Sequence, residues 1–127
     1  MKHLKKYRKF SRTKKQREAM LKIMLGNLFL RGKMTTTLAK AKELKMLAEK
    51  IIIRLKKNPA SRLCRADLPK NISQEILQEI IQRTASRKSG FLRLIRKGPR
   101  LSDGALLAII EFTDGKKSLD TKKNEQK

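Results

Sequence analysis

The chain has 127 residues, which predicts a single domain because domains commonly hold about 100–200 residues. It carries 34 Lys and Arg against 11 Asp and Glu, a formal net charge of +23. Such an excess of positive charge repels itself unless a polyanion binds it. Nucleic acid is the leading candidate, because each backbone phosphate that binds a cation releases a counterion; an anionic membrane and an acidic protein are the alternatives. No apolar segment approaches the ~18 residues that span a bilayer, and a single cysteine excludes an internal disulfide.

A basic segment stands in front of the first predicted helix. Residues 2–17 contain nine Lys or Arg and no Asp or Glu. Secretory signals and mitochondrial presequences also begin with basic residues. The charge run here is too long for a secretory signal, and it continues directly into a predicted helix of the domain. We therefore interpret residues 1–13 as an extended basic arm.

The first helix has clear signals at both ends. Thr13 and Gln16 have the spacing of a capping box, which predicts a helix that begins near Lys14. Gly32 is a typical C-terminal stop. Apolar residues recur at helical spacing between these ends, and they include Met20, Met24 and Leu28.

The middle of the chain predicts one short strand and two further helices. Residues 33–37, KMTTT, include three β-branched threonines and favour an extended segment. A second helix is expected from about Leu38 to Lys56, with the Thr37 side chain as its N-cap and Asn58 before its proline stop. A loop or short helical turn follows around residues 61–70, where Cys64 is expected to be a buried apolar residue. A third helix is then expected to open at Ser73.

The last third predicts a β-hairpin. The segments FLRLIRK and ALLAIIEF have strand composition, and Gly98-Pro99 and Asp103-Gly104 supply turn signals between them. The fold class is therefore α+β, with about three helices packed on a small sheet that ends in a C-terminal hairpin. The expected divisions are a basic arm over residues 1–13, one α+β domain over 14–112 and a disordered polar tail over 113–127.

The sequence offers no constellation for catalysis. Its one histidine, His3, lies in the arm, and no Gly-rich phosphate loop or metal-ligand spacing is present. Glu75 and Glu79 are four residues apart, but they are interpreted as a solvated helix face. We therefore expect that the protein is not an enzyme and that it binds no cofactor, metal or small-molecule substrate.

Two acid-poor regions carry the cationic excess, residues 1–42 and residues 80–102. Tyr7 and Phe10 are interleaved with the arm cations and are candidates for stacking on unpaired bases, whereas Phe91 is expected in the core. A DNA-compacting protein remains an alternative, since it would also be small and basic. An interfacial membrane helix over residues 17–31 is a third interpretation, although a core stripe explains the same pattern more simply.

Three segments resemble the bacterial large-subunit ribosomal protein L-seventeen family. MTTTLAKAKELKMLAEKII, residues 34–52, is similar to the family signature through the Thr36-Thr37 pair and the KAKEL element. MKHLKKYRKFSRTKKQREAM resembles its opening, and GFLRLIRKGPRLSDGALLAIIEF resembles its terminal hairpin. The chain departs from the family at Tyr7, where glycine is usual, and Tyr resists backbone angles that Gly adopts.

The resemblance implies a structural constituent of the large ribosomal subunit. Its implied partners are large-subunit ribosomal RNA and neighbouring ribosomal proteins, without a membrane. Its implied location is the ribosome of the cytoplasm, with an organellar ribosome left open. The expected RNA-binding residues lie in the arm, the first turns of two helices and the hairpin: Lys2, His3, Lys5, Lys6, Tyr7, Arg8, Lys9, Phe10, Arg12, Lys14, Lys15, Arg17, Lys40, Arg93, Arg96, Lys97 and Arg100.

Overall fold

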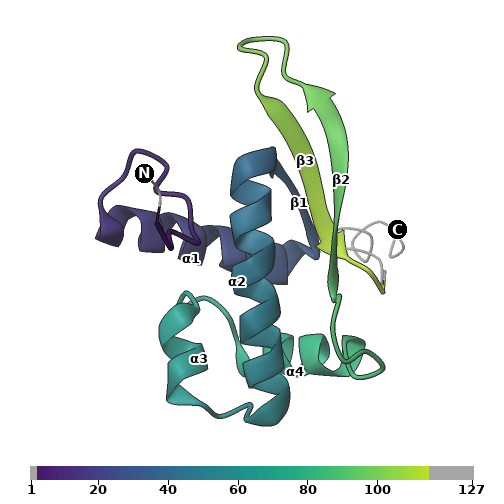
Figure 1. Ribbon diagram of the computed structural model, residues 1–127. Coiled ribbons are helices and arrows are strands. Elements are labelled where there is room, and N and C mark those ends of the chain that lie inside the picture. Colours follow the sequence, from purple (N-terminus) through teal and green to yellow (C-terminus); the bar gives the residue numbers. More distant parts are fainter. Residues whose placement is uncertain (1–2, 115–127) are drawn as a thin grey trace.

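The computed structural model describes residues 3–114, and this part of the chain forms four helices and three strands (Figure 1). The helices are α1 (Lys14–Arg31), α2 (Leu38–Lys57), α3 (Arg62–Asp67) and α4 (Gln74–Arg83). The strands are β1 (Lys33–Thr37), β2 (Leu92–Pro99) and β3 (Leu106–Phe112). The predicted α+β fold, with a C-terminal hairpin and a basic N-terminal arm, is confirmed.

Helix α1 has the predicted ends. The Thr13 side chain accepts a hydrogen bond from the Gln16 backbone N–H, and the Gln16 side chain accepts one from Thr13, which completes the capping box. At the other end Gly32 adopts a left-handed φ of 76° and donates its N–H to the Leu28 carbonyl. That backbone conformation favours glycine and lets the chain turn directly into β1.

The three strands form one antiparallel sheet in the order β1-β3-β2. Ile110 in the central strand lies between Met34 of β1 and Leu94 of β2, so these three side chains share one face. The sheet therefore joins residues from both halves of the chain, and β1 adds a third strand to the hairpin by pairing with the free edge of β3. A register shift between Arg96 and Gly98 bends β2 where the hairpin extends beyond the helices (Figure 1).

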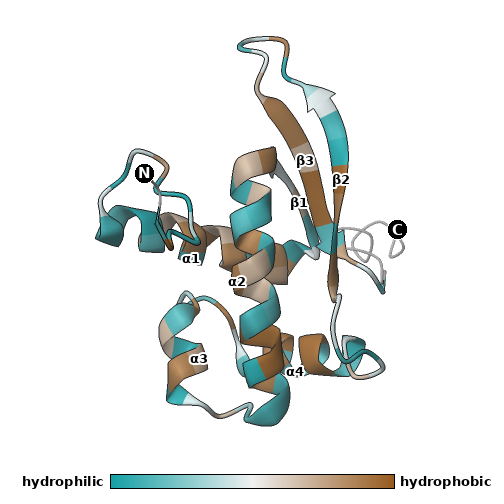
Figure 2. Ribbon diagram, viewed as in Figure 1, coloured by the Kyte–Doolittle hydropathy of each residue, from teal (hydrophilic) through white to brown (hydrophobic). Residues whose placement is uncertain are grey.

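The hydrophobic core lies between the inner face of the sheet and the helices. Helix α2 crosses this face and also packs against the other helices (Figure 1). Figure 2 shows the hydrophobic residues concentrated in β3 and in the interior of the helical layer. The fully buried large side chains come from α1, α2, α3, α4, β3 and the residue before β2: Leu25, Leu28, Leu44, Ile51, Ile52, Leu55, Cys64, Leu77, Phe91 and Ile110.

The structure refines one expectation from the sequence, confirms a second and corrects a third. Residues 62–67 form the short helix α3, which places the fully buried Cys64 against the core. Ser73 caps α4 by accepting the Ile76 N–H, as predicted. The expected side-chain cap at Thr37 is wrong, because its hydroxyl makes no capping hydrogen bond. Thr37 is also the last residue of β1, paired with Leu107, and the strand pleat sets the direction of its side chain.

The predicted tail begins after Phe112, and its first two residues contact the domain. Thr113 donates its N–H to the Phe91 carbonyl and its hydroxyl to the Gly90 carbonyl. Asp114 accepts a hydrogen bond from Arg87 at 2.8 Å. The remaining predicted tail, residues 115–127, lies outside the described residues, so the tail stays a prediction.

Candidate nucleic-acid interface

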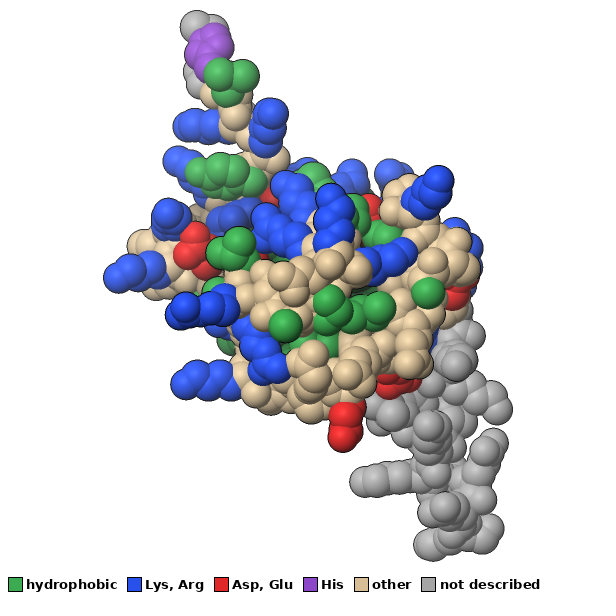
Figure 3. Space-filling view, turned by 90° about the horizontal axis from the view of Figure 1, so that it is seen from below, with side chains coloured by type: hydrophobic (Ala, Val, Ile, Leu, Met, Phe, Trp, Pro, Cys, Tyr) green, Lys and Arg blue, Asp and Glu red, His purple; other side chains and the backbone are tan. Residues whose placement is uncertain are grey.

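The arm reaches α1 through a tight turn over residues 9–12. Arg12 donates its N–H to the Lys9 carbonyl at 3.3 Å, and the two central residues, Phe10 and Ser11, have left-handed φ values of 58° and 52°. Two consecutive left-handed residues define the primed turn that glycine or asparagine would favour. The turn directs the arm away from the body of the molecule, as the projecting segment in Figure 3 shows.

Arg17 connects the arm to both long helices. Its Nη2 donates to Glu43 Oε2 at 3.0 Å, and its Nε donates to the Arg8 carbonyl at 2.6 Å. Its guanidinium also lies over the Tyr7 ring, 4.7 Å from the centroid. Glu43 is only 7% exposed and Arg17 18%, so the pair is largely withdrawn from water. A buried carboxylate requires such a partner, and the same guanidinium thereby holds the arm.

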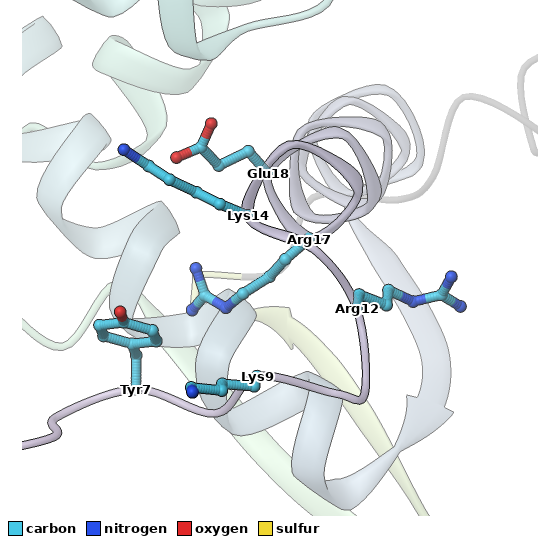
Figure 4. A pocket seen from close by; sticks show the side chains of 6 residues that line it. All are labelled: Tyr7, Lys9, Arg12, Lys14, Arg17 and Glu18. Atoms are coloured by element: carbon cyan, nitrogen blue, oxygen red, sulfur yellow. The ribbon is translucent and has the colours of Figure 1, made fainter.

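A hollow lies between the arm and the first turns of α1 (Figure 4). Its volume is about 410 Å³, and its lining consists of Tyr7, Lys9, Arg12, Lys14, Arg17 and Glu18. Figure 4 shows the charged ends of Lys9 and Arg17 directed towards the side of the Tyr7 ring, that of Lys14 directed towards the side of Glu18, and that of Arg12 pointing away. The hollow thus combines an aromatic surface, several cations and one carboxylate.

The cations of the hairpin region are more extensively paired than the sequence indicates. Residues 80–102 contain no acid, but acids from the following segment reach them. Arg93 pairs with Glu111 across the strands, and Arg87 pairs with Asp114 at 2.8 Å. Arg96 and Lys97 are exposed and form no ion pair within the described residues.

At the hairpin tip, Arg100 and Asp103 form a two-point contact whose Nε to Oδ1 distance is 2.8 Å. The side-chain hydrogen bond from Arg100 and the backbone N–H of Ala105 lower the pKa of Asp103 from 3.8 to about 2. The charge of Arg100 is therefore already balanced by Asp103 before any partner binds.

Comparison with known proteins identifies the family. Residues 20–113 match the family described as Ribosomal protein L17. The chain belongs to the ribosomal protein L17 family. "Large ribosomal subunit protein bL17" of Dictyoglomus turgidum is 37% identical over 115 residues, which cover 88% of this chain and 99% of that protein. The protein of the same name from Thermodesulfovibrio yellowstonii is 35% identical, with 100% of this chain and 98% of that protein covered.

Membership of the ribosomal protein L17 family confirms the resemblance seen in the three sequence segments. It also establishes a non-enzymatic protein, because the family consists of structural ribosomal proteins. Among residues 3–114 no group of three or more His, Cys, Asp or Glu is placed to hold a metal. No helix within that range is long and apolar enough to cross a membrane. The apolar stripe of α1 is part of the core, which removes the basis for an interfacial membrane helix.

The predicted RNA-binding residues of this L17-family chain fall into two separate groups. One group lies in the arm and the first turn of α1, and His3, Lys5 and Lys6 are exposed in the N-terminal part of the arm. The hairpin carries the other group and projects from a different side of the helices (Figure 1). Lys40 is half-buried in the first turn of α2. Lys2 lies outside the described residues, and RNA contact by any of these residues stays a prediction.

Sequence reasoning missed two acids beside the arm, Glu43, which pairs with Arg17, and Glu18, which lines the hollow. Glu43 lies 26 residues beyond Arg17, and only the crossing of α1 and α2 brings the two together. The only signal in the sequence was that Glu43 is the single acid of the KAKEL element and had no predicted role. Glu18 is the first acid in the chain, and its position in a cationic hollow depends on the turn at residues 9–12.

Proposed function

We propose that this chain is a structural constituent of the large ribosomal subunit that binds and stabilises folded large-subunit ribosomal RNA. The arm would provide the main contact, and the hairpin would help to fix the orientation of the domain. Neighbouring large-subunit proteins would be further partners. The family supports the assembly, and the distribution of unpaired charge supports the RNA contact.

One observation carries the RNA contact. Of the eight described cations between residues 5 and 17, only Arg17 is in an ion pair within the described residues; the other seven are Lys5, Lys6, Arg8, Lys9, Arg12, Lys14 and Lys15. All seven are exposed. Cations without a carboxylate partner exchange only water and counterions for phosphate, so they contribute fully to counterion release.

The salt dependence of binding measures this contribution. If about eight phosphates are neutralised, the slope of log affinity against log salt should be roughly −6 to −7 for binding to a folded ribosomal RNA fragment. Replacing Lys5, Lys6 and Lys9 by glutamine should make that slope shallower by roughly 2–3, because three phosphate contacts are lost. A wild-type slope near −1 would contradict the proposal.

A matched control separates the arm from net charge. Lys50, Lys57 and Lys70 are exposed residues outside the arm and the hairpin, and they form no ion pair within residues 3–114. Their replacement by glutamine removes the same charge, and the slope should stay within about 1 of the wild-type value. Equal effects of the two triple variants would show that the arm has no special part in binding.

Cell fractionation tests the ribosomal assignment and the DNA alternative together. The tagged chain should migrate with the large subunit in a sucrose gradient at both low and high magnesium. Migration with the nucleoid, combined with binding of duplex DNA at least as tight as that of folded RNA, would instead favour a nucleoid protein.

A further inference from the structure

The hollow beside Tyr7 has the composition of a site for one nucleotide. We infer that it binds a single unpaired nucleotide of RNA, with a preference for guanine. This inference rests on the proposed RNA-binding function and adds a base preference to it. The geometry assigns the phosphates on either side of the nucleotide to Lys9 and Lys14, the base to the Tyr7 ring and the edge of the base to Glu18.

The size of the hollow suits a nucleotide and not a duplex. Its volume of about 410 Å³ falls in the range of small-molecule sites, about 300–1,000 Å³. A base-paired helix presents bases only at groove edges, and its stacked interior could not enter a space of this size. The occupant must therefore be extruded from a loop, a bulge or a strand end, which is where proteins read RNA sequence.

Two lysines are free to contact phosphates. Lys9 and Lys14 are exposed and form no ion pair within the described residues. In Figure 4 the Lys9 amino group lies on the side of Tyr7, whereas that of Lys14 lies beyond Arg17, on the side of Glu18. Arg17 contributes less charge because Glu43 already accepts from it at 3.0 Å. Arg12 points away in Figure 4 and would reach a neighbouring phosphate of the same strand.

Tyr7 supplies a stacking surface that is already oriented. Its ring has the Arg17 guanidinium over one face, 4.7 Å from the centroid, yet 58% of the residue remains exposed. The guanidinium limits the movement of the ring and leaves surface for a base. Stacking on such a ring depends little on base identity, so Tyr7 should strengthen binding of every nucleotide.

Glu18 supplies the discrimination between bases. Its side chain is exposed, it forms no ion pair within residues 3–114, and it is the only acid that lines the hollow. A carboxylate only accepts hydrogen bonds. Guanine presents two adjacent donors, N1–H and N2–H₂, that match the two carboxylate oxygens. Uracil and adenine place a carbonyl or ring-nitrogen acceptor beside their donor, and that acceptor would face the negative charge.

The test uses the full chain and three labelled RNA pentamers, UUGUU, UUAUU and UUUUU, with affinity measured by fluorescence anisotropy at low salt. The wild-type chain should bind UUGUU at least about five-fold more tightly than UUUUU, the lower end for a bidentate base contact. The chain has one tyrosine and no tryptophan. Saturable quenching of its tyrosine fluorescence by UUGUU should therefore report contact at Tyr7 itself.

Three substitutions separate the parts of the site. Glu18→Gln should weaken UUGUU and strengthen UUUUU, because it removes both the bidentate acceptor and a negative charge. Tyr7→Leu should weaken all three pentamers by a similar factor, about five-fold or more. Lys14→Gln should weaken binding more than Lys15→Gln, since both are exposed in the first turn of α1 and only Lys14 lines the hollow.

The outcomes distinguish this site from general RNA binding. Equal affinity of the wild-type chain for the three pentamers, no saturable quenching, or parallel changes with Glu18→Gln would each overturn the nucleotide site. The proposed function would still stand if folded ribosomal RNA bound with the steep salt slope. Loss of that slope and of migration with the large subunit would overturn the proposed function instead.

Discussion

Replacement of Arg17 by methionine tests whether one side chain holds the arm and the two long helices together. Methionine keeps an unbranched apolar stem and helix propensity while it removes the guanidinium. The substitution leaves the carboxylate of Glu43, which is 7% exposed, without its cationic partner. It also removes the contacts to the Arg8 carbonyl and the Tyr7 ring. We expect a loss of both global stability and arm order.

The magnitude follows from the burial of the pair. Removing one partner of a buried ion pair costs about 3–5 kcal/mol, and the 18% exposure of Arg17 favours the lower end, about 3 kcal/mol. For a chain of 127 residues this corresponds to a Tm decrease of roughly 10 °C. Most of the cost should come from the stranded carboxylate, so Glu43→Gln added to Arg17→Met should recover part of it.

Urea and thermal unfolding followed by circular dichroism provide the measurement. Arg31→Met is the matched control, because Arg31 is exposed, lies in the same helix and forms no ion pair within residues 3–114. If Arg17→Met costs no more than about 0.5 kcal/mol beyond this control, the typical scatter for surface positions, the argument that Arg17 holds the arm is refuted.

Three further predictions concern the core, the hairpin and the arm. A Cβ at Gly26 would lie 2.4 Å from Cγ of Pro69, so Gly26→Ala should destabilise by about 1–2 kcal/mol despite its helix propensity; urea unfolding should show partial recovery with Pro69→Ala, and stabilisation by Gly26→Ala alone would contradict the close contact. Asp103 should titrate near pH 2 by NMR, with its stabilising contact complete above the ordinary pKa of 3.8 and lost as the pH falls towards 2; Arg100→Ala should raise that midpoint, and an unchanged value would exclude the pair as its cause. Amides of residues 3–11 donate no hydrogen bond within the described part of the chain, so they should exchange rapidly when free and slowly in the RNA complex; equal exchange in both states would exclude ordering on binding.

Local signals account for the elements that could be predicted from the sequence. The capping box at Thr13, the glycine stop at Gly32 and the Asp103-Gly104 turn signal all act over a few residues, and local steric and hydrogen-bonding preferences decide them. The predicted turn signal at Gly98-Pro99 is wrong, because both residues belong to β2 and pair with Leu107 and Leu106. The side-chain cap at Thr37 failed for a non-local reason, because that residue also pairs with Leu107 in the sheet.

The sequence by itself predicted a polyanionic partner, indicated the family and placed the helices and strands in order, except at α3, where it left a loop or a short helical turn open. Net charge, periodicity and segment resemblance are properties of the chain alone. Only the tertiary structure decided which cations remain free. Arg93 and Arg87 are paired by acids from the end of β3 and beyond it, and Arg17 is paired by Glu43 on another helix. Ion pairs depend on distances of a few ångströms between residues far apart in sequence, and only folding sets those distances.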